Sequence, residues 1–300
     1  MLRSLFSGVS GMKSQQTKLD VIGNNIANVN TTSFKSARVT FKDMLSQTLQ
    51  GASAPAGGKG GTNPKQAGLG VSVAAIDTNM TQGALQPTGR ATDLAIEGNG
   101  FFIVSDGIEK RYTRDGAFSI DKDGYLITSE GLHVMGFRND NIDDEIAEDN
   151  IPTLSNEDEF DNTDFNNIQN IRIPLKAVVG DGEIKLTSIG IDKDGMVKAI
   201  YGDTTVKIGQ IVTANFQNPV GLYKNGGNTY SASSNSGEPQ LGLAASSGYG
   251  TIQQGILEMS NVDLANEFTE MIITSRAFQA NSRTITTSDE ILQELLNLKR

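Results

Sequence analysis

The chain has 300 residues, a formal net charge of −10 at pH 7, no cysteine and no tryptophan, and 37% of its residues are hydrophobic. Because this length exceeds that of a typical single domain, we expect at least two compact units. The acidic balance argues against nucleic acid and against anionic membrane surfaces, since both require Lys and Arg to neutralise phosphate. The lack of cysteine excludes disulfides and thiolate metal sites.

The first residues hold no continuous apolar segment followed by a small-residue cleavage site, so we expect no cleaved signal peptide. No apolar run is long enough to span a bilayer, so we expect no membrane insertion.

Both ends of the chain show apolar residues at helical spacing. The rows at the N-terminal end consist of Leu5, Met12, Leu19 and Ile26, with Val9 and Ile22 beside them. The rows at the C-terminal end consist of Leu264, Met271, Phe278, Ile285 and Leu292, with Phe268 and Leu296 beside them. Sustained spacings of three and four predict coiled-coil-like helices that pair along a narrow seam. The alternative is two amphipathic helices lying on a globular core.

The N-terminal helix is poorly suited to stand alone. Gly8, Gly11 and Gly23 each cost a helix roughly 1 kcal/mol relative to alanine. Ser275, Ser282 and Asp289 interrupt the C-terminal seam. We therefore expect both helices to be weakly ordered in the free chain and to become ordered against neighbouring copies, with the apolar rows as the polymerisation interface.

The centre of the chain is typical of β structure. Residues 51–66 are rich in Gly, Ala and Pro and predict a flexible connector. From about 70 to 250, short alternating segments lie between Gly-containing turns, a pattern that predicts hairpins. The predicted fold is mainly β with α-helical termini. Its predicted parts are a helical domain over 1–34 and 256–300, a connector over 35–69, a discontinuous β domain over 70–138 and 206–255, and an inserted outer domain over 139–205.

An acidic stretch lies between Asn139 and Ile171, with eleven Asp or Glu residues and no Lys or Arg. A solvated loop or flap is the ordinary interpretation of such a stretch. A surface for a cationic partner is the alternative.

Two turns, Asp121-Lys-Asp-Gly124 and Asp192-Lys-Asp-Gly195, resemble the start of a calcium loop. An EF-hand loop requires a glutamate at its last position and a helix on each side. Leu132 and Asp203 stand at that position here, between strand-like flanks, so we predict β-turns. A surface adhesin that binds calcium through these hairpins is one rival function.

No constellation predicts catalysis, a cofactor or a metal site. His133 is the only histidine, which excludes metal sites built on several histidines. Gly98-Asn-Gly100 lacks the third glycine of a dinucleotide fingerprint. A glycosidase pair could be chosen from the 35 acidic residues, but nothing in the sequence places two of them together.

Three segments carry a family resemblance. Residues 19–49, LDVIGNNIANVNTTSFKSARVTFKDMLSQTL, resemble the N-terminal signature of flagellar rod and hook proteins, and residues 257–300 resemble the matching C-terminal end. The segments TGRATDLAIEGNGFFIV and YTRDGAFSIDKDGYLIT are also similar to that family. The signature positions are Asn24, Asn25, Asn28, Phe34, Arg276, Phe278, Gln279 and Asn281. Ser33 departs from the family's usual glycine, and Ser275 from its usual glutamine.

The resemblance implies a structural subunit and not an enzyme. The start of the chain, RVTFKDMLSQTL and GGTNPKQAGLGVSV resemble hook members more than distal rod members, which are the alternative. Such a subunit forms a homopolymer, a bendable tube that transmits motor torque from rod to filament. The implied partners are other flagellar proteins: the rod, the hook cap, the hook–filament junction and the type III export apparatus. The implied location is the bacterial flagellum outside the cell.

Overall fold

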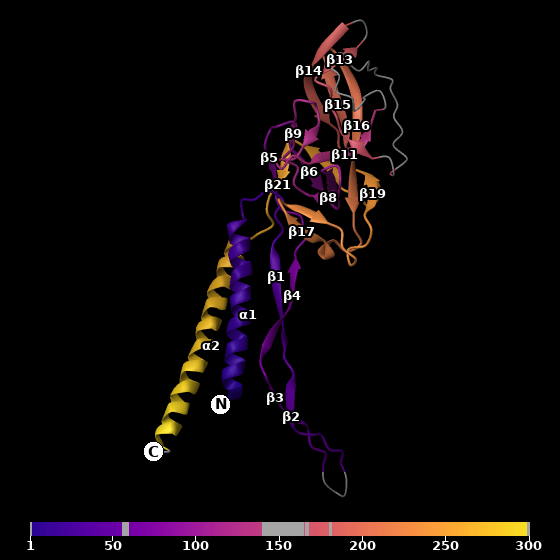
Figure 1. The fold of residues 1–300 in the computed structure, drawn as a ribbon. Coiled ribbons are helices and arrows are strands. Elements are labelled where there is room, and N and C mark those ends of the chain that lie inside the picture. Colours follow the sequence, from indigo (N-terminus) through magenta and orange to yellow (C-terminus); the bar gives the residue numbers. More distant parts are fainter. Residues whose placement is uncertain (1, 56–59, 140–164, 166–167, 180–181, 299–300) are drawn as a thin grey trace. The chain divides into compact units, whose positions relative to one another are not determined.

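The structure is a computed structural model that describes residues 2–55, 60–139, 165, 168–179 and 182–298. It is mainly β, with one long helix at each end of the chain, which confirms the predicted fold class (Figure 1). Contacts divide the chain into two units. Unit 1 comprises Met1–Val29, Lys35–Asn79 and Val262–Arg300, and unit 2 comprises Asn30–Phe34 and Met80–Asn261.

Unit 1 is built on two antiparallel helices, α1 (Leu2–Ala27) and α2 (Leu264–Leu298). Ser4 near the start of α1 lies opposite Ser288 of α2, with 3.4 Å between the two Oγ atoms. Because α2 continues to Leu298, roughly its last two turns extend past the start of α1. Asp263 caps α2, since its Oδ1 accepts the backbone N–H of Ala265 at 2.9 Å.

A two-stranded ribbon lies on the other side of α1 from α2. Strand β1 (Ala37–Asp43) pairs antiparallel with β4 (Val71–Thr78), and β2 (Ser46–Gln50) pairs antiparallel with β3 (Lys65–Gly68). Every residue of β2 is exposed.

The structure corrects two predicted boundaries. Much of the predicted connector over 35–69 forms strands, because alternating residues such as Val39 turn one side of the ribbon inward, where Val39 is buried. The predicted helical domain over 1–34 and 256–300 includes residues outside the helices: α1 ends at Ala27, and strand β21 (Ile256–Glu258) precedes α2.

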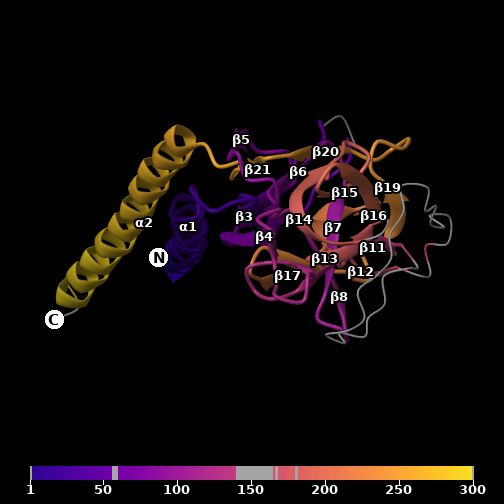
Figure 2. The same cartoon turned by 90° about the horizontal axis from the view of Figure 1, so that it is seen from above.

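Unit 2 contains a large antiparallel sheet and two short strand pairs (Figure 2). The main path of the sheet runs β13 (Lys176–Val179), β14 (Gly182–Ile191), β15 (Met196–Tyr201), β16 (Thr204–Asn215), β11 (His133–Arg138), β7 (Phe101–Ser105), β8 (Lys110–Thr113), β18 (Thr229–Ser231) and β17 (Tyr223–Gly226). Off this path lie β9 (Ser119–Ile120), β10 (Leu126–Ile127), β12 (Gln169–Asn170) and β19 (Gln240–Leu243). The short pairs are β20 (Thr251–Gln254) with β6 (Leu94–Glu97), and β21 with β5 (Leu85–Pro87). A short 3₁₀ turn, η1 (Pro219–Gly221), precedes β17.

Strand β7 shows why the run Phe-Phe-Ile-Val is continuously apolar. Phe102 and Val104 belong to one hydrophobic cluster, whereas Phe101 and Ile103 belong to a second cluster on the opposite face. A strand that is buried on both faces has no polar side to display. The sheet therefore has a core on each side of β7.

Both Asp-Lys-Asp-Gly segments form the predicted turns. Gly124 and Gly195 have φ of 86° and 80°, a region that favours glycine, and each donates its N–H to the backbone carbonyl of the aspartate three residues earlier, at 2.9 Å. His133 lies in strand β11 and its ring stacks edge-on against Tyr125. The turns and the histidine therefore have ordinary structural surroundings.

The acidic stretch that we predicted as a loop or flap lies mostly outside the described residues. Neither described helix is long and apolar enough to cross a membrane.

Candidate assembly surfaces

The two helices of unit 1 meet through small residues. Gly8 and Gly11 of α1 are buried, and a Cβ on Gly8 would lie 3.0 Å from Cγ1 of Ile285. On α2, Thr274 and Ser288 are buried although both are polar. Glycines on α1 and small hydroxyl side chains on α2 allow the two helix backbones to approach closely.

Polar links fix the register of the helix pair. Lys18 Nζ lies 2.5 Å from Glu270 Oε2. Asn25, which is buried, donates from Nδ2 to the carbonyl of Ala37 at 2.9 Å and to Oε1 of Glu267 at 3.1 Å. Its Oδ1 accepts the N–H of Ala37 at 3.0 Å. Asn25 thus joins α1, α2 and the start of β1 at one point.

Glu267 lies in a partly desolvated position within this network. Burial raises the pKa of its carboxyl above the ordinary value, while the hydrogen bond from Asn25 acts in the opposite direction. The neutral form of Glu267 is therefore favoured more in the folded chain than in the unfolded chain.

The predicted seam residues divide into two groups. The half-buried or buried group consists of Leu5, Met12, Leu19, Ile22, Ile26, Met271, Phe278, Ile285 and Leu292. The exposed group consists of Val9, Leu264, Phe268 and Leu296, with exposed fractions of 38%, 39%, 50% and 68%. Their role as an interface between copies stays a prediction.

Further apolar side chains on the helices face solvent, and the heptad pattern did not single them out. This set is Phe6, Ile272, Ile273, Ile291, Leu295 and Leu298. Together with Phe268 and Leu296, its members on α2 form what we call the α2 apolar surface. Ile272 lies one helical turn from Phe268, and both side chains are exposed, by 62% and 50% respectively. We therefore expect the α2 apolar surface to be an interaction surface.

The signature positions lie at several structural points. Asn28 donates from Nδ2 to the Asn24 carbonyl at 2.9 Å just past the end of α1. Arg276 and Gln279 contact each other on the exposed side of α2, at 3.2 Å. Two other signature positions, Asn281 and Phe34, contact residues outside the signature. Asn281 faces Gly11 of α1, and the ring of Phe34 in unit 2 lies 5.1 Å from Nζ of Lys224.

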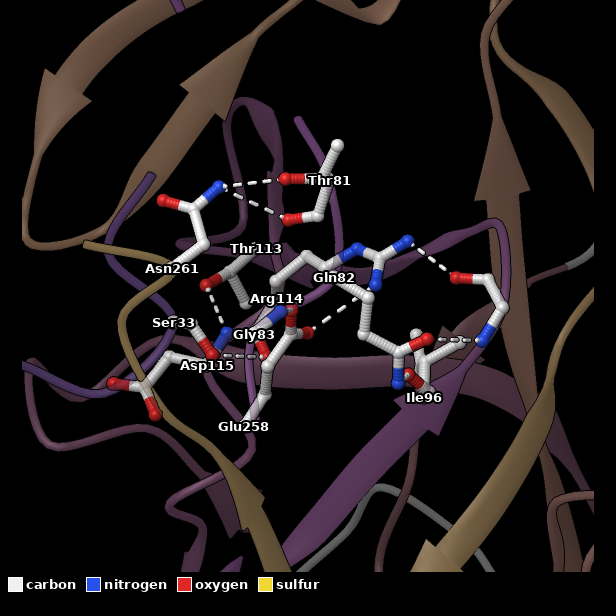
Figure 3. A network of polar contacts seen from close by, with 11 residues as sticks. Ser33, Thr81, Gln82, Gly83, Ile96, Thr113, Arg114, Asp115, Glu258 and Asn261 are labelled. Carbon is white, nitrogen blue, oxygen red and sulfur yellow. Dashed lines mark hydrogen bonds and ion pairs between the residues drawn. The ribbon is translucent and has the colours of Figure 1, made fainter. Parts of the chain in front are cut away.

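A buried polar network in unit 2 was not predicted from the sequence (Figure 3). Arg114 and Glu258 are almost fully buried, and Arg114 Nη1 lies 3.2 Å from Glu258 Oε2. Ser33 adopts φ of 55° and donates its Oγ hydrogen to the Arg114 carbonyl at 2.7 Å. Only the departure of Ser33 from the family's glycine could have drawn attention to this position.

The described part of the chain offers little that resembles an active site. Its described residues contain no group of three or more His, Cys, Asp or Glu side chains that could hold a metal ion. A small hollow in unit 2 is lined by Thr113, Asp115, Glu130 and neighbouring residues. Its volume of about 10 Å³ has room for one water-sized molecule.

Family models match three stretches of the chain. Residues 5–35 match the flagella basal body rod protein model, residues 95–199 match the D1 domain of the flagellar hook proteins FlgE, FlgF and FlgG, and residues 253–298 match the C-terminal model of the flagellar basal body rod FlgEFG proteins. The first stretch covers α1 from residue 5 to its end, and the third covers all of α2.

Relatives match over the whole chain. The flagellar basal-body rod protein FlgG of Bacillus subtilis is 48% identical over 302 residues, covering all of both chains. The flagellar hook protein FlgE of Borreliella burgdorferi is 35% identical over 441 residues, again covering all of both chains. The flagellar hook protein FlgE of Helicobacter mustelae is 48% identical over 176 residues, which cover 58% of this chain and 37% of that protein. A solved Helicobacter pylori hook protein FlgE2 overlaps with a TM-score of 0.41 and 12% identity over 58% of this chain and all of that one, a likeness too slight to support an inference.

Proposed function

Because the chain belongs to the flagellar rod and hook protein family, we propose that it is a subunit of the flagellar hook that polymerises through its terminal helices. The family consists of structural proteins of the flagellum and not of enzymes, and its members form part of the flagellum outside the cytoplasm. The hook assignment and the interface are our proposal.

The α2 apolar surface is the observation that carries the assembly part of the proposal. Phe268, Ile272 and Leu296 are each at least half exposed. Covering such side chains removes apolar area from water, which contributes roughly 25 cal/mol per Å². A second copy of the chain supplies the same apolar residues, so the surface can be covered without another kind of protein.

The hook assignment draws on three sequence segments and on the relatives. The start of the chain, RVTFKDMLSQTL and GGTNPKQAGLGVSV resemble hook members. Relatives named as hook proteins also match all of this chain. In this role the polymer is a bendable tube that transmits torque from rod to filament, and its ends contact rod, cap and junction proteins.

The distal rod is the second candidate. The relative named as a rod protein in Bacillus subtilis is 48% identical and aligns over 302 residues, whereas the full-length hook relatives require 441 and 463 aligned residues. The close agreement in length favours a rod subunit, which builds a short and straight shaft.

Electron microscopy of polymers made from purified protein in a sulfate-rich buffer tests the proposal. Curved tubes are expected from the full chain, and none from a variant that lacks residues 1–30. Straight, rigid rods would move the assignment to the distal rod. Monomers under all conditions would contradict assembly through the chain's own helices.

A further inference from the structure

The chain crosses between the two units four times, after Val29, Phe34, Asn79 and Asn261. Three segments of unit 2 lead to these crossings. They are 30–34, the residues from Met80 onward, and the residues up to Asn261. Any force that passes along the chain from one unit to the other passes through these segments.

Glu258 binds all three segments. It belongs to the last segment itself, and its backbone carbonyl accepts the N–H of Ser33 at 2.8 Å. Its Oε1 accepts the N–H of Gly83 at 2.8 Å. Because the side chain is fully buried, water does not compete for these hydrogen bonds.

Asn261, three residues after Glu258, also links the same three segments. Its backbone N–H donates to the carbonyl of Phe34 at 3.4 Å. Its Nδ2 donates to both oxygens of Thr81, at 3.1 Å to the carbonyl and 3.2 Å to the hydroxyl. Hydrogen bonds therefore link the three segments at two positions, Glu258 and Asn261.

Arg114 joins these ties to the core of unit 2. Its Nη1 lies 3.2 Å from Glu258, its Nη2 donates to the Gly98 carbonyl at 2.6 Å, and its guanidinium lies 5.5 Å from the ring centroid of Phe101. Phe101 belongs to a hydrophobic cluster of the large sheet. Figure 3 shows the side chains of Arg114 and Glu258 pointing toward each other between the chain segments.

We propose that Ser33, Gly83, Arg114, Glu258 and Asn261 form an exit clamp that fixes the directions in which the chain leaves unit 2, with Glu258 as its central positioning residue. Ion pairs buried this deeply are weak sources of net stability, but they hold geometry because their hydrogen bonds are directional. The clamp limits the movement of these three segments relative to the rest of unit 2. Its consequence for the stiffness of the assembled tube rests on the proposed function.

Spin labels within unit 2 test the clamp without any polymer. Since the chain has no cysteine, Asn30→Cys on the first segment and Lys110→Cys on strand β8 give two defined and exposed sites. Glu258→Ala is expected to widen the distribution of distances between the labels. It is also expected to speed amide exchange at Ser33 and Gly83 by on the order of tenfold or more. Gly83 loses its buried acceptor, and the Glu258 carbonyl that accepts the N–H of Ser33 loses the side-chain contacts that position it.

A double variant separates positioning from simple stability. Replacing a buried ion pair by apolar residues of similar size is often neutral for folding, so Arg114→Met with Glu258→Leu is expected to recover most of the melting temperature lost in Glu258→Ala. The label distances are expected to stay wide, since neither apolar side chain restores the polar contacts that position Glu258, whose backbone carbonyl accepts the N–H of Ser33 in the labelled segment. A double variant with distances as narrow as the parent's would overturn the proposal.

A matched control removes another charged pair of unit 2. Lys198 and Asp192 form an ion pair at the surface, outside the clamp. Asp192→Asn is expected to leave the label distances unchanged. If it widens them as much as Glu258→Ala does, the clamp has no special role.

The tube itself gives the second readout. Polymers of the double variant are expected to bend more strongly under thermal motion than those of the parent, and equal stiffness would contradict the clamp's mechanical role. If the parent forms no polymers, the proposed function fails while the label measurement still decides whether the clamp exists.

Discussion

Gly11 of α1 faces Asn281 of α2 so closely that a Cβ on Gly11 would lie 2.7 Å from the side-chain nitrogen of Asn281. The same holds one turn earlier, where Gly8 faces Ile285. The glycines that weaken α1 as an isolated helix are therefore the residues that allow α2 to pack against it. Gly23 is different, because a Cβ there would meet nothing within 4 Å.

This contrast predicts opposite effects for two glycine substitutions. Gly8→Val is expected to destabilise the helix pair by about 1–3 kcal/mol through overpacking. Gly23→Ala is expected to stabilise it by up to about 1 kcal/mol, since alanine is the better helix former. Thermal unfolding followed by far-ultraviolet circular dichroism measures both, and a Gly8→Val variant as stable as the parent would contradict the close packing.

The α2 apolar surface predicts assembly mutants that leave the monomer intact. Phe268→Asp or Ile272→Asp is expected to abolish polymerisation with little change in melting temperature, because both side chains are exposed in the single chain. Sedimentation separates polymer from monomer. Thr269→Asp, which adds the same charge at an adjacent exposed position, serves as the control and is expected to assemble.

Phe278 offers a second test of the predicted seam. Phe278→Asp is expected to abolish assembly while the β-rich unit 2 keeps its fold. Since Phe278 is half-buried in unit 1, the variant is also expected to loosen the helix pair, unlike Phe268→Asp. Normal polymers from Phe278→Asp would remove this residue from the interface.

Asn25 predicts a large loss of stability from one small truncation. Asn25→Ala leaves the partly buried N–H and carbonyl of Ala37 without their side-chain partners, at an expected cost of about 2–3 kcal/mol. Denaturant unfolding measures the loss. Asn24→Ala, at the exposed neighbouring position, is expected to change stability by about 0.5 kcal/mol or less, and equal losses in the two variants would contradict the role of Asn25.

Glu267 predicts a pH dependence of the helix pair. Its pKa is raised in the folded chain by burial, so the folded state binds the proton more tightly than the unfolded state. This residue's contribution to stability is therefore greatest at low pH and falls as pH rises through the carboxyl range. Glu267→Gln is expected to flatten that part of the unfolding free energy against pH, and an unchanged profile would show that other groups dominate.

Ser33 predicts an order among three variants. Ser33→Ala keeps the left-handed backbone and loses the hydrogen bond to Arg114, for a loss of about 1 kcal/mol. Ser33→Gly loses the same bond but relieves about 1–2 kcal/mol of backbone strain, so its stability is expected to equal or exceed the parent's. Ser33→Val is expected to be the least stable, because a β-branched residue is a poor fit at positive φ. Melting temperatures rank the three.

Local patterns were sufficient for the hairpins and the terminal helices of this fold. The hairpins around Gly124 and Gly195 follow from turn chemistry that is complete within a few residues, and the terminal helices follow from apolar spacing. The strands between Ala37 and Gly68 were missed because most of their residues are exposed, so their pattern resembles that of a linker.

The contacts within the helix pair could not be obtained from apolar spacing. Thr274 and Ser288 are buried against α1, whereas Phe268 and Ile272 face solvent. A pattern of apolar residues marks surfaces that exclude water, but it does not say whether the same chain or a neighbour covers them. Arg114 and Glu258 lie 144 residues apart in sequence, so no local signal connects them.

The end of α2 past the start of α1 affects what a spectrum of the free chain reports. From Ile291 to Leu298 this stretch extends past the start of α1, and all of its residues except the half-buried Leu292 are exposed, so little packing holds the helix there. We therefore expect these last two turns to fray in the free chain in solution. If a second copy covers them in the polymer, polymerisation is expected to increase the helical ellipticity by the contribution of about two turns.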